Sequence, residues 1–204
     1  MPTTAIVSSA YLPPIAFFKI LTEHPSVSME AFEHFPKQTY RNRCEIYGAN
    51  GLLSLSIPIE KNSIRTLTKD IRIAYDHNWQ HLHWRSMQSA YRRSPFFEFY
   101  EDDFAPFYRS QKNIFLKDYN DEFLILLFKL LKINPSIKNT IAYEKNYESV
   151  LDFRNKITPR KSAEPFVYKA KTYTQVFESK HGFIPNLSIV DLLFNQGPKA
   201  TEYF

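Results

Sequence analysis

The chain has 204 residues, of which 44% are hydrophobic and 16% aromatic, and its formal net charge is +5. This length and composition predict a single globular domain spanning residues 1–204, and the modest charge argues against a dedicated nucleic-acid-binding protein. One cysteine excludes an internal disulfide framework and a cysteine-based zinc site, and the four glycines form neither a P-loop nor a dinucleotide-binding fingerprint.

The sequence carries no feature of a secreted or membrane-spanning protein. The apolar stretch near the N-terminus lacks a preceding cationic segment and is interrupted by Pro13-Pro14, so no signal peptide is expected. The longest apolar run, 123–131, is too short to span a bilayer and contains Lys129. Together with the single cysteine, these features favour a cytoplasmic location.

Short buried strands and a hairpin are predicted in the first half of the chain. Tyr11-Leu12-Pro13-Pro14 is a rigid turn, and its second proline suits the first turn of a helix. Asn50-Gly51 favours a tight hairpin turn, and the segment 53–59 alternates apolar and polar residues, with Leu53 and Leu55 on its buried side. The expected elements are strands at 4–9, 27–29, 43–47, 53–59 and 71–75 and a helix at 15–22.

The second half of the chain is predicted to be mainly helical. From Asn78 the apolar residues recur at helical spacing, and Ser94-Pro95 ends this helix or starts the next. Asn120 or Asp121 is expected to cap a further helix that runs to Leu131. Additional helices are expected at 96–109, from Thr174 to Gly182, and from Ser188 to Gly197-Pro198. These elements predict an α/β domain with a short, partly parallel sheet and a β-hairpin flanked by helices, with an α+β fold as the alternative.

The segment 151–175 differs from the rest of the chain in charge and pattern. It contains six basic residues and two acidic ones, and Pro159 and Pro165 interrupt it. Its lack of periodicity predicts a long loop, and long ordered loops in compact domains are often functional. We expect this basic loop to act as a lid that closes over a site and excludes water.

A basic run just before the predicted hairpin is the strongest candidate for a binding surface. It contains Lys37, Arg41 and Arg43 and no acidic residue, and these side chains suit a phosphate or carboxylate. Gln38 and Asn42 add amide groups for the same ligand. On a strand, Arg41 and Arg43 would share one face, with Asn42 on the other. The alternative is an edge strand whose charges keep the protein soluble.

Two further side chains are candidate catalytic residues near the reacting centre. Tyr11 follows the first strand, and ligands of open α/β sheets bind at the carboxyl ends of the strands, where Ser8-Ser9 would also lie. His83 has the side chain of a general base, although it lies on the apolar face of its helix with Trp79 and Leu82. The alternatives are a packed turn for Tyr11 and a buried core histidine for His83.

Trp84 and Asp191 are candidate substrate-binding residues. Trp84 is expected on the polar side of its helix, where its ring can stack on a sugar or simply face water. Asp191 is the third residue after Ser188, so a capping box explains it equally well. Several acidic residues cluster at 98–103. Two of them would suit the paired carboxylates of a glycosidase, and the alternative is a solvated helix face. No metal site and no cofactor is expected, because the histidines and carboxylates lack ligand spacing.

Four segments of the chain form a recognisable set: Ala10-Tyr11-Leu12-Pro13-Pro14-Ile15, the run from Lys37 to Arg43, the stretch with Trp79, His83-Trp84, Tyr91 and Pro95-Phe96-Phe97-Glu98, and 186–198. In type and order they resemble the WbqC-like family, and together they cover nearly the whole chain. Many relatives have a His-Gln-Pro stretch before the Tyr-Leu-Pro turn, whereas this chain has Ser8-Ser9-Ala10, so a mechanism that uses that histidine is not expected here.

The resemblance implies work on sugars or activated sugars, because members of the family are often associated with gene clusters for O-antigen and other surface polysaccharides. We therefore expect group transfer to a nucleotide-linked or amino sugar, with a small anionic substrate at the basic run. The alternative is a non-catalytic binding module for a nucleotide, RNA or an anionic glycan, because basic and aromatic residues interleave at Tyr40-Arg41 and Tyr168-Lys169. Nucleic acid is the less favoured partner. A structural partner in a polysaccharide complex would instead expose an apolar patch.

Overall fold

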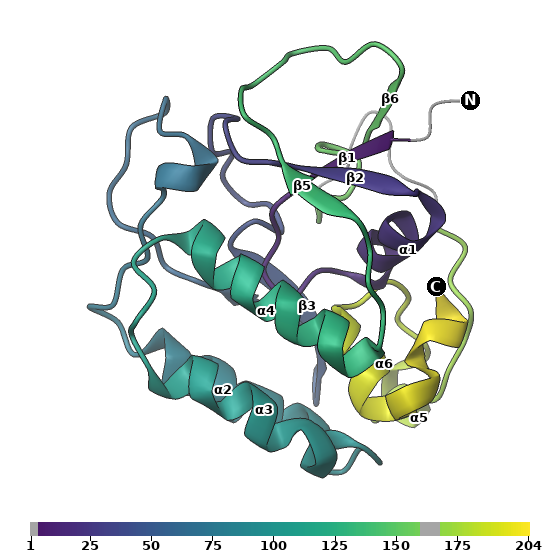
Figure 1. Ribbon diagram of the computed structural model, residues 1–204. Coiled ribbons are helices and arrows are strands. Elements are labelled where there is room, and N and C mark those ends of the chain that lie inside the picture. The colour runs from purple at the N-terminus through teal and green to yellow at the C-terminus, as the bar shows by residue number, and fades with distance from the viewer. Residues whose placement is uncertain (1–3, 160–167) are drawn as a thin grey trace.

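The computed structural model describes residues 4–159 and 168–204, and one side of the fold is a small parallel sheet (Figure 1). The strand order is β5-β2-β1-β6, and all three pairings are parallel. The carboxyl ends of β1, β2 and β6 therefore lie at one edge, where Ser8, Glu30 and Asp152 are the last residues. The four strands are β1 (Thr4–Ser8), β2 (Ser26–Glu30), β5 (Ile137–Asn139) and β6 (Val150–Asp152).

The predicted hairpin forms a separate two-stranded sheet. Strands β3 (Arg43–Gly48) and β4 (Gly51–Ser56) are antiparallel, and Gly51 supplies the positive φ of the turn (101°). Leu55 is buried as predicted, but Leu53 is 37% exposed. The expectation for Leu53 was wrong because its same-face neighbours toward the tip are Gly48 and Gly51, which have no side chain to cover it.

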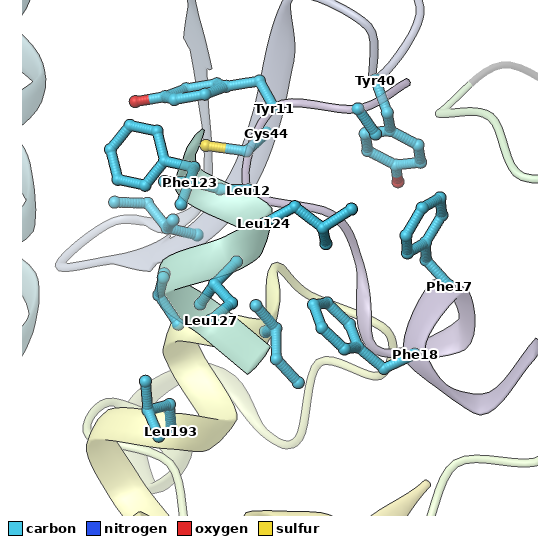
Figure 2. Packing of buried hydrophobic residues seen from close by; sticks show 14 of the residues in the cluster. Tyr11, Leu12, Phe17, Phe18, Tyr40, Cys44, Phe123, Leu124, Leu127 and Leu193 are labelled. Carbon is cyan, nitrogen blue, oxygen red and sulfur yellow. The ribbon is translucent and has the colours of Figure 1, made fainter. Parts of the chain in front are cut away.

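Helices cover the sheet and build most of the core. Figure 1 shows α4 lying between the parallel sheet and the α2–α3 pair. Helix α4 packs on α3 through stacked Phe107 and Phe123 rings 3.9 Å apart, and Figure 2 shows Phe123, Leu124 and Leu127 in the same cluster as Leu193. The helices are α1 (Ile15–Glu23), α2 (Trp79–Tyr91), α3 (Phe97–Arg109), α4 (Leu116–Leu131), α5 (Glu178–His181) and α6 (Ile189–Gln196), with short 3-10 helices at Thr68–Asp70 and Gly197–Tyr203.

The structure confirms the α/β class and corrects several element boundaries. Helix α4 begins at Leu116, one turn before the predicted cap, because the amide of Asn120 binds Ser9 and the Arg41 carbonyl inside the fold. The predicted strand at 71–75 forms only isolated bridges, and the helix predicted from Thr174 is reduced to the short α5. Within the described part of the chain, no helix has the length and apolar character to cross a bilayer.

Candidate functional site

Four residues of the basic run line one surface groove of about 490 Å³. They are Lys37, Gln38, Asn42 and Arg43, and the segment from Ile59 to Asn62 forms the facing wall. Lys61 on that wall adds a third cation that the sequence reasoning missed. The polar Glu60-Lys61-Asn62 triplet directly after the alternating strand was the available signal.

The groove carries positive charge, because the one acid among its described lining residues is ion-paired with a residue outside the groove. Glu60 forms an ion pair with Arg72, with 3.2 Å between Arg72 Nε and Glu60 Oε2. Lys37, Arg43 and Lys61 have no ion-pair partner within residues 4–159 and 168–204. Three uncompensated cations around one concave surface attract an anion.

A turn at Asn42 brings the two walls of the groove together. The Asn42 amide Nδ2 donates to the Ile57 carbonyl at 2.9 Å, and the Ile57 N–H donates to the Asn42 carbonyl at 2.7 Å. These bonds join the segment after β4 to the entry of β3. Gln38 in the same loop has a left-handed backbone (φ 60°), a conformation that costs energy and concentrates at functional sites.

Two buried polar atoms beside the groove lack hydrogen-bond partners among the described residues. They are the Arg43 Nε and the Asn42 Oδ1. A buried polar group left without a partner costs on the order of 1–3 kcal/mol, so native proteins seldom retain one without a reason. A donor and an acceptor on consecutive residues of the groove lining thus lack a partner among the described residues.

Arg41 does not belong to the groove, and the prediction that it shares a face with Arg43 was wrong. A turn, in which the Asn42 N–H donates to the Thr39 carbonyl, precedes β3, so the two-residue period of a strand does not extend to Arg41. The Arg41 side chain is 3% exposed and donates to both carboxylate oxygens of Glu33, at 2.7 and 2.8 Å. Its charge is therefore already neutralised.

The carboxyl edge of the parallel sheet is filled by paired charges. Arg154 donates to Glu30 at 3.1 Å and to Asp152 at 2.6 Å, and Arg41 also donates to Ser8 Oγ at 2.5 Å. The cavity lined by Ser8, Arg41 and Arg154 has a volume of about 10 Å³, which is room for one water molecule. Ser8-Ser9 lies at this edge as predicted, but both hydroxyl groups are already hydrogen-bonded to other protein side chains.

The predicted basic lid is in part a fixed portion of the fold. Val150–Asp152 forms β6, and Arg154 is a buried anchor that also donates to the carbonyls of Glu144 and Lys145. The part of the lid at 160–167 lies outside the described residues.

Tyr11 and His83 are brought together, as predicted, but inside the core. The Tyr11 hydroxyl lies 3.1 Å from His83 Nδ1 and 2.8 Å from the Tyr108 hydroxyl, and His83 Nε2 lies 3.2 Å from the Ser56 carbonyl. Because a carbonyl only accepts, Nε2 carries the proton. Nδ1 therefore accepts from Tyr11, which in turn accepts from Tyr108.

This buried hydrogen-bond chain is electrically neutral. Burial lowers the pKa of His83 to about 4, and burial raises the pKa of the Tyr11 hydroxyl. Tyr11 is 0% exposed and His83 4%, and Figure 2 shows Tyr11 packed beside Phe123. A solvent-borne substrate in the groove does not reach either side chain in this conformation.

Trp84 and Asp191 are also buried, which contradicts the expected polar face for Trp84. The Trp84 ring stacks on Tyr108 with centroids 5.4 Å apart. The capping-box interpretation was wrong as well, because Ser188 Oγ donates to the Leu12 carbonyl. Asp191 instead accepts hydrogen bonds from Tyr173 and Gln175 at 2.7 and 3.0 Å, and burial raises the pKa of its carboxyl group.

Comparisons with known proteins assign the chain to a family. The model of the WbqC-like protein family matches residues 8–166 and 161–203. A relative in Mycobacterium tuberculosis (strain ATCC 25618 / H37Rv), described as uncharacterized protein Rv1507c, is 24% identical over 226 residues, which cover 100% of this chain and 97% of the relative. No solved structure shows significant similarity to the chain. The chain therefore belongs to the WbqC-like family.

Proposed function

We propose, from the membership of the WbqC-like family and from the cationic groove, that this protein binds the anionic part of an activated sugar during synthesis of surface-polysaccharide precursors. The observation that carries the proposal is the convergence of Lys37, Arg43 and Lys61 on one groove whose only acid, Glu60, is paired with Arg72. The association of the family with surface-polysaccharide gene clusters supports the sugar part of the ligand.

The groove offers complementary groups to both parts of such a ligand. The Arg43 guanidinium provides a planar fork for a phosphate, and Lys37 and Lys61 provide mobile point charges on opposite walls. Asn42 lines the groove, and a rotation of its side chain would expose the buried amide oxygen, which has no partner among the described residues, to a sugar hydroxyl.

Group transfer is the reaction we propose for this ligand, and binding without chemistry is the second candidate. A specific observation favours the second candidate: Tyr11 and His83, which were the predicted catalytic pair, use their polar atoms on each other and on protein neighbours. Enzymatic transfer at the groove therefore requires a conformational opening of the core around α2, or a reacting group supplied by a substrate.

A ligand screen followed by paired charge variants tests the groove. Nucleotide sugars, pyrophosphate and short RNAs are first screened for an increase in melting temperature, because a ligand that binds the native state stabilises it by mass action. For a stabilising ligand, the double variant Lys37→Ala/Lys61→Ala should weaken binding by at least about tenfold in calorimetric titrations. The double variant Lys138→Ala/Lys199→Ala changes the net charge equally at exposed positions far from the groove in sequence and should bind normally.

Three outcomes discriminate the alternatives. Equal weakening in both double variants would mean a non-specific charge effect and would remove the groove from the proposal. Binding of short RNA that falls steeply with salt would favour the polyanion-binding module, because phosphate-backbone binding releases counterions. Release of the nucleotide from a bound nucleotide sugar in the presence of an acceptor, detected by chromatography, would establish group transfer.

A further inference from the structure

A second cationic groove lies at the opposite end of the hairpin. It has a volume of about 560 Å³, and the end of α2, the hairpin tip at Ala49 and the segment Val176-Phe177 line it. Arg43, in the first groove, and Ala49 are six residues apart along β3, a distance of about 20 Å at the rise of a strand. The two grooves are therefore too far apart for one small ligand to fill both.

Three arginines on one side of this groove have no partner in the part of the chain that the structure describes. Arg85, Arg92 and Arg93 are exposed and make no ion pair or side-chain hydrogen bond within the described ranges 4–159 and 168–204. Arg85 and the C-cap residue Arg92 are seven residues apart, which is two helical turns, so both project from the same side of α2. The negative end of the helix dipole at the C-terminus of α2 favours the cations of Arg92 and Arg93, which follow the helix directly.

The facing wall of the groove is apolar and firmly held. The half-buried Phe177 ring packs against Tyr47 with centroids 5.7 Å apart. The Tyr47 hydroxyl contacts the carbonyls of Phe177 and Gly182, at 3.2 and 2.6 Å. Lys180 Nζ and His181 Nε2 both donate to the Ala49 carbonyl, at 3.1 and 3.0 Å, so the segment after Phe177 is hydrogen-bonded to the hairpin tip.

The positive region is compact because acidic residues border it. Gln88 lines the groove and donates to Glu101 at 3.0 Å, and Glu101 belongs to the acidic 98–103 stretch of α3. On the other wall, Glu178 accepts from the Gln175 N–H. A long polyanion would meet these carboxylates, whereas a small ligand with concentrated charge would not.

We propose that this groove binds a nucleoside diphosphate, with the phosphates on Arg85, Arg92 and Arg93 and the base against Phe177. Arginine forks bind phosphate oxygens in pairs, and two phosphate groups match three arginine charges. Aromatic rings provide stacking surfaces for bases of any sequence. The volume of the groove is in the range of small-molecule sites.

Calorimetric titration of the full chain with ADP, UDP and pyrophosphate tests this site. The triple variant Arg85→Gln/Arg92→Gln/Arg93→Gln should weaken all three probes by at least about tenfold. The triple variant Arg65→Gln/Arg109→Gln/Lys199→Gln makes the same change in net charge at exposed positions outside the groove and should retain binding. Phe177→Leu keeps apolar bulk but removes the ring, so it should weaken ADP and UDP severalfold and leave pyrophosphate unchanged.

Each alternative outcome overturns the proposal in a recognisable way. The proposed diphosphate site is wrong if neither ADP nor UDP binds the wild-type protein saturably, or if the two triple variants lose affinity equally. Equal effects of Phe177→Leu on ADP and pyrophosphate would reduce the site to a phosphate site without a base subsite. The variant Lys37→Ala/Lys61→Ala removes two cations of the first groove. Diphosphate binding that this variant retains and the arginine triple variant loses belongs to the second groove, so failure of the two sites is measured separately.

Discussion

The carboxyl edge of the parallel sheet and the groove beside the hairpin contain similar side chains in opposite states. At the sheet edge, Arg41 and Arg154 are buried and each is ion-paired with a carboxylate. In the groove, Lys37, Arg43 and Lys61 are without ionic partners among the described residues. Arg41 and Arg43 are two positions apart in one run, so the difference between them arises from the fold and not from the local composition.

The comparison separates positive charge that holds the structure together from positive charge that is available to a ligand. A buried arginine whose fork is filled by Glu33 has no remaining attraction for a phosphate, and its removal would leave a buried carboxylate uncompensated. An arginine without a partner contributes little to the fold and retains its affinity for anions. Stability and binding should therefore respond in opposite ways to changes at the two regions.

The largest effect is expected from Arg41→Ala. Breaking a buried ion pair by removing one partner costs about 3–5 kcal/mol, because the remaining charge stays buried. The variant should lower the free energy of unfolding by that amount in urea denaturation followed by circular dichroism. The matched change Arg43→Ala, in the same run, should alter it by less than about 1 kcal/mol.

A double variant distinguishes ion pairing from simple packing at Arg41. Arg41→Met/Glu33→Met removes both charges and keeps apolar bulk, so it should be more stable than Arg41→Ala alone. If the double variant is as unstable as the sum of its single changes, then the pairing with Glu33 is not the source of the effect.

A dependence of stability on pH is expected from His83 in the core. Its pKa is about 4 in the folded protein and 6.5 ordinarily, so between these values the unfolded chain binds a proton that the native protein does not. His83 should contribute fully to stability above pH 6.5 and lose about 3 kcal/mol as the pH falls toward 4. Urea denaturation at several pH values measures this slope.

The exposed His81 provides the control for the pH slope. His83→Gln should flatten the dependence between pH 6.5 and 4, whereas His81→Gln, two residues away, should leave it intact. The difference between each variant and the wild type is the quantity to compare, because Asp191, whose carboxyl pKa is raised by burial, contributes a slope of the opposite sign. An unchanged slope in His83→Gln would contradict the assignment.

Periodicity and turn chemistry predicted most of the fold, and side-chain pairing across the fold decided the rest. The buried face of α2 agrees with the prediction at Trp79 and His83 but differs from it along one edge. Gln80 is buried because its amide donates to the carbonyls of Phe107 and Ser110, at 2.8 and 2.7 Å, so Trp84 is buried and Leu82 exposed. A buried polar residue of this kind carries no signal in a hydrophobic pattern.

The candidate site was predictable to the extent that its residues are local in sequence. Lys37 and Arg43 were identified by their charge and Gln38 and Asn42 by their amide groups, all within one short run of the sequence. The exclusion of Arg41 depends on Glu33, which reaches it across an irregular segment with no periodic pattern. Lys61 joins the groove only because the chain after β4 is hydrogen-bonded to Asn42.

The smallest change in stability, and the sharpest test of the comparison, is expected from Arg43→Met. The substitution keeps the aliphatic stem and removes a buried Nε that has no acceptor among the described residues. Because an unsatisfied buried donor costs energy, the variant should be unchanged in stability or gain up to about 1 kcal/mol. It should also lose affinity for the groove ligand, as measured by calorimetric titration.

A residue whose removal preserves the fold and abolishes binding is retained for binding, at some expense of stability. Lys138→Met, on the exposed edge strand β5, provides a charge-matched control that should affect neither property. If Arg43→Met instead lowers the free energy of unfolding as strongly as Arg41→Ala, then Arg43 has a structural partner in solution. The charges of the groove, like those of the sheet edge, would then serve to stabilise the fold.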